Sequence, residues 1–261
     1  MWSQARHRMI LDRLARDGRI AISDIVAETG VSRETARSDL VELEAQGIVL
    51  RRRGGAVLTD DPTARPEPNH LTRLSEALQE KEVIAALAVK LLPPRSSCFI
   101  DAGTTTAIFG RALVGRTDLD IVTNSLSIAR CLSVEHNVTL LGGQPDADRQ
   151  GVYGDLTLSL IQRYNLDFAV ISPVAIDATA GLTNYAFAET AVATAMINHA
   201  AQAIVLAHSA KLGQRSRVQI CPLDRIHILV SEASVVDQLD QACLDAVHLV
   251  CPPPGAASSN S

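Results

Sequence analysis

The chain has 261 residues, of which 47% are hydrophobic, and its formal net charge is −5 at pH 7. This length and apolar content suffice for one small domain and one of ordinary size. No apolar run approaches the roughly 18 residues of a membrane span, and the first residues lack the plan of a secretion signal. We therefore expect a cytoplasmic protein.

The cysteines do not form a pattern typical of a disulfide framework or a zinc site. They are five in number, none makes a C-x-x-C pair, and no histidine stands nearby at ligand spacing. Free buried thiols are the interpretation that fits Cys98, Cys131, Cys221, Cys243 and Cys251. We expect no metal site and no cofactor.

Charge is divided unevenly along the chain. Residues 1–58 hold ten arginines against eight acidic residues, a net +2, which leaves −7 for the remainder. Because DNA is a dense array of negative phosphates, the first segment suits DNA and the rest would be repelled by it.

A first helix is predicted around Ile22, Ile25 and Val26, which lie at helical spacing. The hydroxyl of Ser23 is predicted to cap the first free N–H groups of this helix. Gly30 is predicted to end it, because glycine adopts the left-handed backbone of a helix terminus at little cost.

A second helix follows at once. Val31 is expected to fill the angle between the two helices, and Ser32 to cap the second one. An inward apolar stripe at i, i+4 and i+7 is formed by Ala36, Leu40 and Leu43. The polar residues near the start of this helix point elsewhere and can meet base edges in the major groove: Arg33, Thr35, Arg37 and Ser38.

After Gly47 the pattern changes to two short apolar runs, residues 48–50 and 56–58, around a glycine turn. Arg51, Arg52 and Arg53 stand at the predicted tip of this β-ribbon, where they suit phosphate or minor-groove contact. Separately, two helices can be a simple αα-hairpin, and a run of arginines a solvated face. Their order within so few residues favours a recognition helix followed by a wing.

The spacing VSxxTxRxDLxxLxxxGxxxRxxGGA, within residues 5–58, is similar to the DNA-binding domain of the DeoR family of bacterial transcriptional regulators. The resemblance implies a winged helix-turn-helix of α+β class that binds double-stranded operator DNA. The family commonly has a second arginine where Ser38 stands and a histidine where Arg53 stands. We predict DNA contacts from Ser32, Arg33, Thr35, Arg37, Ser38, Arg51, Arg52 and Arg53.

Residues 59–69 carry three prolines and few apolar side chains, which is typical of an extended linker. We therefore predict a DNA-binding domain over residues 1–58, a linker over 59–70, and a second domain over 71–251. The tail from residue 252 to 261 is expected to be disordered.

In the second domain, an amphipathic helix through Ile84, Leu87 and Leu91 precedes a series of short apolar runs. The runs alternate with helical segments and span residues 98–100, 121–123, 138–141, 168–171, 203–207 and 226–230. This alternation predicts an α/β domain with a mainly parallel sheet and helices on both faces.

Ligands of such sheets bind beyond the carboxyl ends of the strands. The segment DAGTTT follows a predicted strand: Asp101 ends it, Gly103 permits close approach of a ligand, and hydroxyls open a helix whose dipole favours a phosphate. Similar residues follow other strands: Asn124 and Ser125, Gly142 and Gly143, and Lys211. Ordinary turn chemistry is the alternative for each loop, and for Gly142 and Gly143 it is equally well supported.

The ordered segments KEVIAALA, FIDAGTTT, IVTNSLSIA, LLGG, LDFAVI and AKLG, from Lys81 to Gly213, resemble the DeoR-family sensor domain, whose fold is similar to sugar-phosphate isomerases. The resemblance implies a repressor of a carbohydrate or polyol operon that a phosphorylated sugar or polyol releases from DNA. It places effector contacts at Asp101, Gly103, Thr104, Thr105, Thr106, Asn124, Ser125 and Lys211, to which the loops add Gly142 and Gly143.

The chain departs from the family where Ala102 replaces a serine and His208 an aspartate. Where the family often has glycines, this chain has Ser172, Pro173 and Ala175. The family also often has a basic pair near the positions of Ala193 and Thr194. Losing that pair removes charge-assisted hydrogen bonds, so the effector is less anionic, differently seated, or absent. Tyr153, Tyr185 and Phe187 are interpreted as packing residues in preference to a platform for a sugar, and His208 as a structural histidine in preference to a sensor.

Two rival functions remain open. An enzyme could use Asp101, Glu189 or Lys211 as acid and base, although no second carboxylate stands beside Asp101 in sequence and the wing has no catalytic purpose. A domain that only oligomerises is the other. We expect no catalytic residues, and a homo-oligomer, because one recognition helix reads only a few base pairs.

Overall fold

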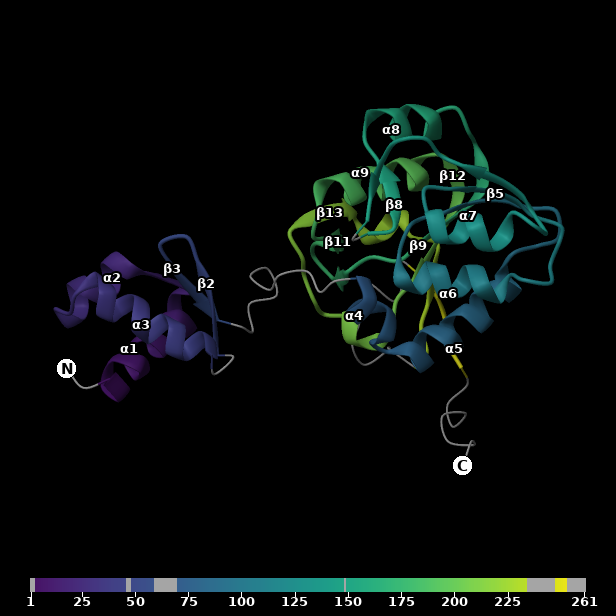
Figure 1. Cartoon of the computed structure of the whole chain (residues 1–261). Coiled ribbons are helices and arrows are strands. Elements are labelled where there is room, and N and C mark those ends of the chain that lie inside the picture. The colour runs from purple at the N-terminus through teal and green to yellow at the C-terminus, as the bar shows by residue number, and fades with distance from the viewer. Residues whose placement is uncertain (1–2, 46–47, 59–69, 148, 234–246, 253–261) are drawn as a thin grey trace. The chain divides into compact units, whose positions relative to one another are not determined.

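The computed structural model describes residues 3–45, 48–58, 70–147, 149–233 and 247–252. The chain divides into two compact units, Met1–Glu67 and Pro68–Ser261, which are shown in Figure 1. Residues 59–69 of the predicted linker and residues 253–261 of the predicted tail lie outside the described residues. His70, the last residue of the predicted linker, begins a helix.

The N-terminal unit consists of three helices and a three-stranded antiparallel sheet. The helices are α1 (Ser3–Asp17), α2 (Ile22–Thr29) and α3 (Arg33–Ala45). The strands β1 (Arg19–Ala21), β2 (Val49–Arg52) and β3 (Gly55–Leu58) pair in the order β1-β3-β2. One core joins them, formed by Ile10, Leu14, Ile20, Ile25, Ala36, Leu40, Leu43, Val49 and Ala56. This is a winged helix-turn-helix, in which the sequence had predicted α2, α3 and the ribbon but neither α1 nor β1.

The junction between α2 and α3 confirms two local predictions. Gly30 follows α2 with a left-handed backbone, φ 69°, and its N–H donates to the carbonyl of Val26. The Ser32 hydroxyl accepts a hydrogen bond of 3.1 Å from the N–H of Thr35 and so caps α3.

The predicted cap of α2 is wrong, because Ser23 lies inside the first turn of that helix. Strand β1 pairs with β3 as far as Ala21, and the N–H of Ile22 still donates to Gly54 on the ribbon. The helix therefore begins directly after the strand. Its first turn is closed by the carboxylate of Asp24, which accepts from the N–H of Ala21 at 3.3 Å.

The C-terminal unit is built on a seven-stranded sheet in the order β15-β14-β12-β9-β4-β5-β6, and every pairing in it is parallel. The strands are β4 (Ser97–Ile100), β5 (Asp120–Thr123), β6 (Asn137–Leu140), β9 (Leu166–Ile171), β12 (Ala200–Leu206), β14 (Ile228–Val230) and β15 (His248–Val250). The six predicted apolar runs all contribute a strand, and β15 is the addition. The predicted α/β class is confirmed.

Helices cover both faces of this sheet (Figure 1). Cys98 and Ile100 of β4 pack with α5 (Leu78–Ala88), α6 (Thr104–Ala112) and α7 (Leu126–Leu132), whereas Phe99 packs with α8 (Asp155–Ile161) and α9 (Phe187–Asn198). Successive strand residues point to opposite faces, so both faces need an apolar layer. Shorter helical segments are α4 (His70–Ser75), Val89–Leu91, Ser209–Lys211 and Leu223–Arg225.

Two small antiparallel sheets, which were not predicted, extend the unit. One joins β10 (Ala175–Asp177), β11 (Gly181–Asn184) and β13 (Val218–Cys221), and the other joins β7 (Gln144–Asp146) and β8 (Gly151–Tyr153). The N–H of Val152 on β8 donates to the carbonyl of Asn124 at 2.8 Å. The β7–β8 hairpin is thereby held against the carboxyl end of β5.

Cys98, Cys131, Cys221 and Cys251 are free thiols, and Cys243 lies outside the described residues. None of the helices in the described part of the chain has the length and apolar character needed to cross a membrane.

Candidate functional site

The recognition helix α3 separates a buried face from an exposed one. Leu40 and Leu43 are 1% exposed, as predicted, while the side chains of Arg33, Arg37 and Ser38 are open to solvent. Thr35 is half-buried, and its hydroxyl lies 2.9 Å from that of Ser32 in the cap. The start of α3 therefore presents arginines and hydroxyls together, as a helix that reads base edges requires.

The tip of the ribbon consists of Arg53 and Gly54, because Arg52 already pairs with Gly55 across the strands. Gly54 has a φ of 91°, which glycine adopts without strain. A Cβ on Gly55 would lie 2.0 Å from the carbonyl oxygen of Ile20, so strand β1 can approach only a glycine here. The two glycines thus allow the tight turn of the wing, and Arg53 lies at its tip.

The three ribbon arginines differ in their surroundings. Arg51 Nε lies 2.7 Å from Glu44 Oε2, and the backbone N–H of Arg51 donates to the other carboxylate oxygen, which ties the ribbon to the end of α3. Arg52 and Arg53 are exposed. A groove of about 490 Å³ between α3 and the ribbon is lined by Ile22, Arg37, Leu40, Arg51, Arg52, Arg53, Gly54 and Gly55. Four arginines on one groove make it suited to phosphate.

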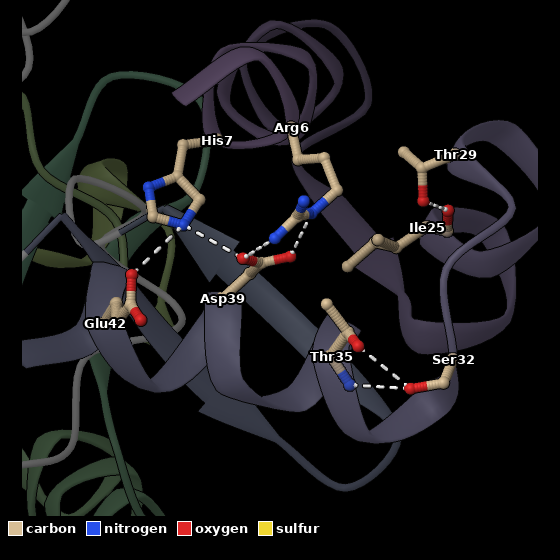
Figure 2. A network of polar contacts seen from close by, with 8 residues as sticks. All are labelled: Arg6, His7, Ile25, Thr29, Ser32, Thr35, Asp39 and Glu42. Carbon is tan, nitrogen blue, oxygen red and sulfur yellow. Dashed lines mark hydrogen bonds and ion pairs between the residues drawn. The ribbon is translucent and has the colours of Figure 1, made fainter. Parts of the chain in front are cut away.

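Figure 2 shows what fixes α3 against α1. Arg6 of α1 donates from Nε and from a terminal nitrogen to the two carboxylate oxygens of Asp39, both at 2.7 Å. Burial alone would raise the pKa of Asp39, but the hydrogen bonds and charge of Arg6, together with His7, hold it below its usual value. The aspartate of the DL motif therefore positions the recognition helix.

His7, Asp39 and Glu42 also place potential metal ligands within 4.8 Å of one another (Figure 2). Both carboxylate oxygens of Asp39 already accept hydrogen bonds from the Arg6 guanidinium. A cation bound there would lie against that guanidinium, so the cluster is explained by its role in joining the helices.

In the C-terminal unit, the loops after β4 and β5 meet, as predicted. The N–H of Ala102 donates to Asn124 Oδ1 at 2.8 Å and to Asp101 Oδ1 at 2.9 Å. Asp101 is 4% exposed, and burial, helped by the charge of Glu189, raises its pKa to about 8. The raised pKa favours the protonated carboxyl group, which can donate a hydrogen bond.

Helix α6 begins at Thr104, with Gly103 as its N-cap. Thr105 and Thr106 are fully buried, and Thr104 is 9% exposed. Thr106 donates its hydroxyl to the carbonyl of Gly103 at 3.1 Å, whereas Thr105 Oγ1 has no partner among the described residues. Their contact with a ligand stays a prediction.

Other predicted contacts have structural roles. The Ser125 hydroxyl accepts from the N–H of Ile128 and caps α7. The carbonyl of Gly142 accepts from Thr157 at 2.8 Å, and a Cβ on Gly143 would lie 2.2 Å from the Thr157 hydroxyl oxygen. Close packing of α8 thus accounts for both glycines, and their contact with an effector remains untested.

Lys211 reaches the end of the neighbouring strand β9. Its ammonium donates to Ser172 Oγ at 3.1 Å and to the carbonyl of Pro173 at 2.6 Å. Ser172 in turn flanks Gly103, since a Cβ there would lie 3.8 Å from the Ser172 Cβ. Burial and the charges of Lys81 and Arg73 lower the pKa of Lys211 to about 7. The lysine and the start of α6 therefore share one edge of the sheet.

Lys81, which the sequence analysis had not assigned to the site, lies close to Lys211. It is 2% exposed, and its ammonium donates to the carbonyls of Arg73 and, at 2.7 Å, Glu76. Burial, followed by the charges of Lys211 and Lys81, lowers the pKa of His208 to about 4. The sequence did carry a signal for this role: Lys81 stands three positions before Ile84, so it lies on the apolar face of α5, where a lysine is unusual.

A second polar cluster joins Glu189, which was named only as a possible acid or base of an enzyme, to residues that were not assigned to the site. Arg149 Nε lies 3.2 Å from Glu189 Oε1, and a terminal nitrogen of Arg149 donates to Asp146 Oδ2 at 2.6 Å. Tyr153 is 5% exposed, and burial, with the charges of Asp101 and Glu189, raises the pKa of its phenol. The structure thus supplies the second carboxylate that Asp101 lacks in sequence.

Comparison with known proteins matches both units. The profile of the DeoR-like helix-turn-helix domain matches residues 6–61, and that of the DeoR C terminal sensor domain matches residues 76–233. The chain belongs to the DeoR family. The predicted resemblance is confirmed, and this DeoR-family protein is a DNA-binding transcriptional regulator.

Three curated relatives are repressors. The chain is 34% identical to the HTH-type transcriptional repressor GlcR of Bacillus subtilis, over 89% of each protein. It is 32% identical to a putative aga operon transcriptional repressor of Escherichia coli, over 90% of this chain and 88% of the relative. It is 29% identical to the glycerol-3-phosphate regulon repressor of Escherichia coli, over 87% of this chain and 90% of the relative.

Similarity to solved structures is weaker. Ribose 5-phosphate isomerase A of Methanocaldococcus jannaschii matches with a TM-score of 0.39 and 18% identity, over 52% of this chain and 55% of that one. Translation initiation factor eIF-2B of Pyrococcus horikoshii matches with a TM-score of 0.42 and 11% identity, over 86% and 82%.

Proposed function

We propose that this DeoR-family regulator represses a carbohydrate or polyol operon and leaves its operator when a phosphorylated sugar or polyol binds the sensor domain. The observation that carries the proposal is the position of Lys211 and Lys81 near the loop that opens α6. The names of the relatives, which include a glycerol-3-phosphate regulon repressor, support the same ligand class.

The anionic group of the effector would bind on the lysine side of the site. Burial, followed by the charges of Lys81 and Arg73, lowers the pKa of Lys211, and burial together with the charge of Arg73 lowers the pKa of Lys81. A phosphate between them would remove that penalty, and the N-terminus of α6 would add the positive end of a helix dipole.

The basic pair that the family commonly places near Ala193 and Thr194 has no counterpart there. Ala193 is fully buried in the core, and Thr194 donates its hydroxyl to the carbonyl of Ile220 at 2.8 Å. We infer that the phosphate depends on Lys211 and Lys81 instead of on α9.

The DNA-binding contacts proposed are those of Ser32, Arg33, Thr35, Arg37, Ser38, Arg52 and Arg53, with Arg51 acting also through Glu44. One winged helix reads a short half-site, so we propose a homo-oligomer whose heads bind half-sites about 34 Å apart. A ligand that prefers the sensor arrangement of the unbound protein would then lower operator affinity.

The test follows three readouts with one panel of sugar and polyol phosphates: thermal stability, operator release and product formation. We expect at least one compound to stabilise the protein and release operator without being converted. Stabilisation with a converted product would instead support an isomerase, with Asp101 and Glu189 as the acid and base pair. No effect of any compound on stability or DNA would contradict the proposal and favour a domain that only oligomerises.

A further inference from the structure

The hydroxyl of Tyr153 is a buried polar group without a hydrogen-bond partner in the described part of the chain. Buried polar atoms are nearly always paired, because leaving one unsatisfied costs free energy. A phenylalanine would fill the same apolar space without that cost. Among the described residues, the hydroxyl is therefore free to bond a ligand.

The surroundings of this hydroxyl lie on the edge of the sheet that carries Asp101. The Tyr153 oxygen and the Ala102 methyl group are both 2.8 Å from the position that a Cβ on Gly151 would occupy, so both border the same point beside Gly151. Family members often have a serine where Ala102 stands. In this chain Ala102 brings no hydroxyl, and the hydroxyl of Tyr153 on β8 lies nearby.

Glu189 and Arg149 complete the cluster from two further elements. Glu189 is 7% exposed, lies in the first turn of α9, and is near enough to Asp101 to raise its pKa. Arg149, in the segment that joins β7 to β8, contacts Glu189 at 3.2 Å and Asp146 at 2.6 Å. Two carboxylates hold the guanidinium in a fixed direction, and the guanidinium in turn orients Glu189.

These groups suit hydroxyls better than an anion. A carboxylate accepts hydrogen bonds from neighbouring hydroxyls, a phenol donates and accepts, and the protonated carboxyl of Asp101 can donate. A phosphate would be repelled by Glu189 and Asp146. The cationic side of the site, at Lys211 and Lys81, is formed by other elements.

We propose that Tyr153, Glu189 and Arg149 form a hydroxyl-recognition subsite, which binds the polyol or sugar end of the effector while its anionic group lies at Lys211. The inference rests on the proposed function. It adds that these residues recognise the hydroxyl-bearing end of the ligand. Tyr153 contacts the ligand directly, and Arg149 acts by positioning Glu189.

The test compares the full chain with Tyr153→Phe and a matched control, Tyr164→Phe, whose half-buried ring packs edge-to-face on Phe99 at 6.2 Å. Titration calorimetry would use ribose 5-phosphate, sorbitol 6-phosphate and methyl phosphate, and the same samples would be assayed for operator release. We expect Tyr153→Phe to weaken the two hydroxylated ligands by about tenfold and to leave methyl phosphate unchanged. Tyr164→Phe should match wild type throughout.

The outcomes separate this inference from the proposed function. Operator release by a hydroxylated ligand with equal affinity for wild type and Tyr153→Phe would overturn the subsite and keep the proposed function. A Tyr153-dependent affinity without operator release would support the subsite and contradict the proposed switch. No binding of either hydroxylated ligand to wild type at millimolar concentration would overturn both.

Discussion

Two buried aspartates show how differently the two units use charge. Asp39 in the DNA-binding unit is 2% exposed and accepts two hydrogen bonds from Arg6, and its pKa lies below the usual value. Asp101 in the sensor is 4% exposed, forms no ion pair with any described residue, and its pKa is raised to about 8. The charged carboxylate of Asp39 stabilises the fold through its ion pair with Arg6. In contrast, burial of Asp101 favours the neutral form of its carboxyl group.

This difference extends to where each unit keeps its functional groups. The DNA-binding unit presents its arginines on an exposed surface and encloses a separate core. The sensor buries Asp101, Lys81 and Glu189 within its framework, at a cost in stability that a ligand can offset. We therefore expect ligand binding to be coupled to the packing of the sensor, and DNA binding to leave the core of the wing domain unchanged.

The largest effect is expected where a buried pair is broken. Asp39→Ala leaves the Arg6 guanidinium without its acceptor and should lower the melting temperature of the DNA-binding unit by roughly 10–20 °C. Differential scanning calorimetry of the full chain measures this, with the exposed Asp12→Ala as control. Equal melting of the two variants would show that the pair does not hold α1 and α3 together.

Asp101→Asn should raise the stability of the chain, in contrast to Asp39→Ala. The pKa is about 8 in the folded chain and about 4 in the unfolded one, so wild type loses stability as pH rises through this window. Asparagine cannot ionise, and the variant should exceed wild type by roughly 2–4 kcal/mol near pH 8 and by little near pH 4. Urea unfolding across pH measures the difference, with the exposed Asp224→Asn as control. A pH-independent difference would refute the neutral carboxyl.

On the exposed surface, substitutions should change DNA binding and not stability. Arg37→Ala should weaken specific operator binding by about 1–3 kcal/mol, and Arg53→Ala should weaken binding to all DNA while reducing the salt dependence by about one charge. Titration of fluorescent duplexes at several salt concentrations separates the two. If both variants lose the same affinity on operator and on random DNA, α3 does not read the bases.

The smallest effect concerns the cap of the recognition helix. Ser32→Ala removes the acceptor for the Thr35 N–H and should destabilise the unit by about 1 kcal/mol. Ser23→Ala should cost less, because Ser23 is exposed and does not cap α2. Urea unfolding of both variants checks this order, and the reverse order would restore the cap predicted from sequence.

The sequence was sufficient where a few neighbouring residues decide the structure. Gly30 and the Ser32 cap depend on backbone groups within four positions, and the six apolar runs are long enough to mark strands. Ser23 was assigned wrongly because β1 has only three residues and exists through its pairing with the distant strand β3. A strand that depends on pairing with another segment, such as β15 with β14, leaves little local pattern.

In the candidate site, too, the sequence predicted the residues whose neighbours in the chain mark them and not those that distant segments bring together. Asp101, Asn124 and Lys211 were predicted because they directly follow strands or lie in a loop with a known motif. Arg149 and Glu189 come from a hairpin and a helix far apart in the chain, and no spacing connects them. Tyr153 had been interpreted as a packing residue, since burial of a tyrosine does not show whether its hydroxyl has a partner.

Operator release by an effector, measured in wild type and in Lys211→Ala and Thr105→Ala, tests the central claim most directly. The sensor should couple to DNA by about 1–3 kcal/mol in wild type. Both variants should bind operator nearly as wild type does, because neither residue lies in the DNA-binding unit, and should no longer release it at effector concentrations that release wild type. Release from both variants at an unchanged concentration would contradict the account and place the effector elsewhere.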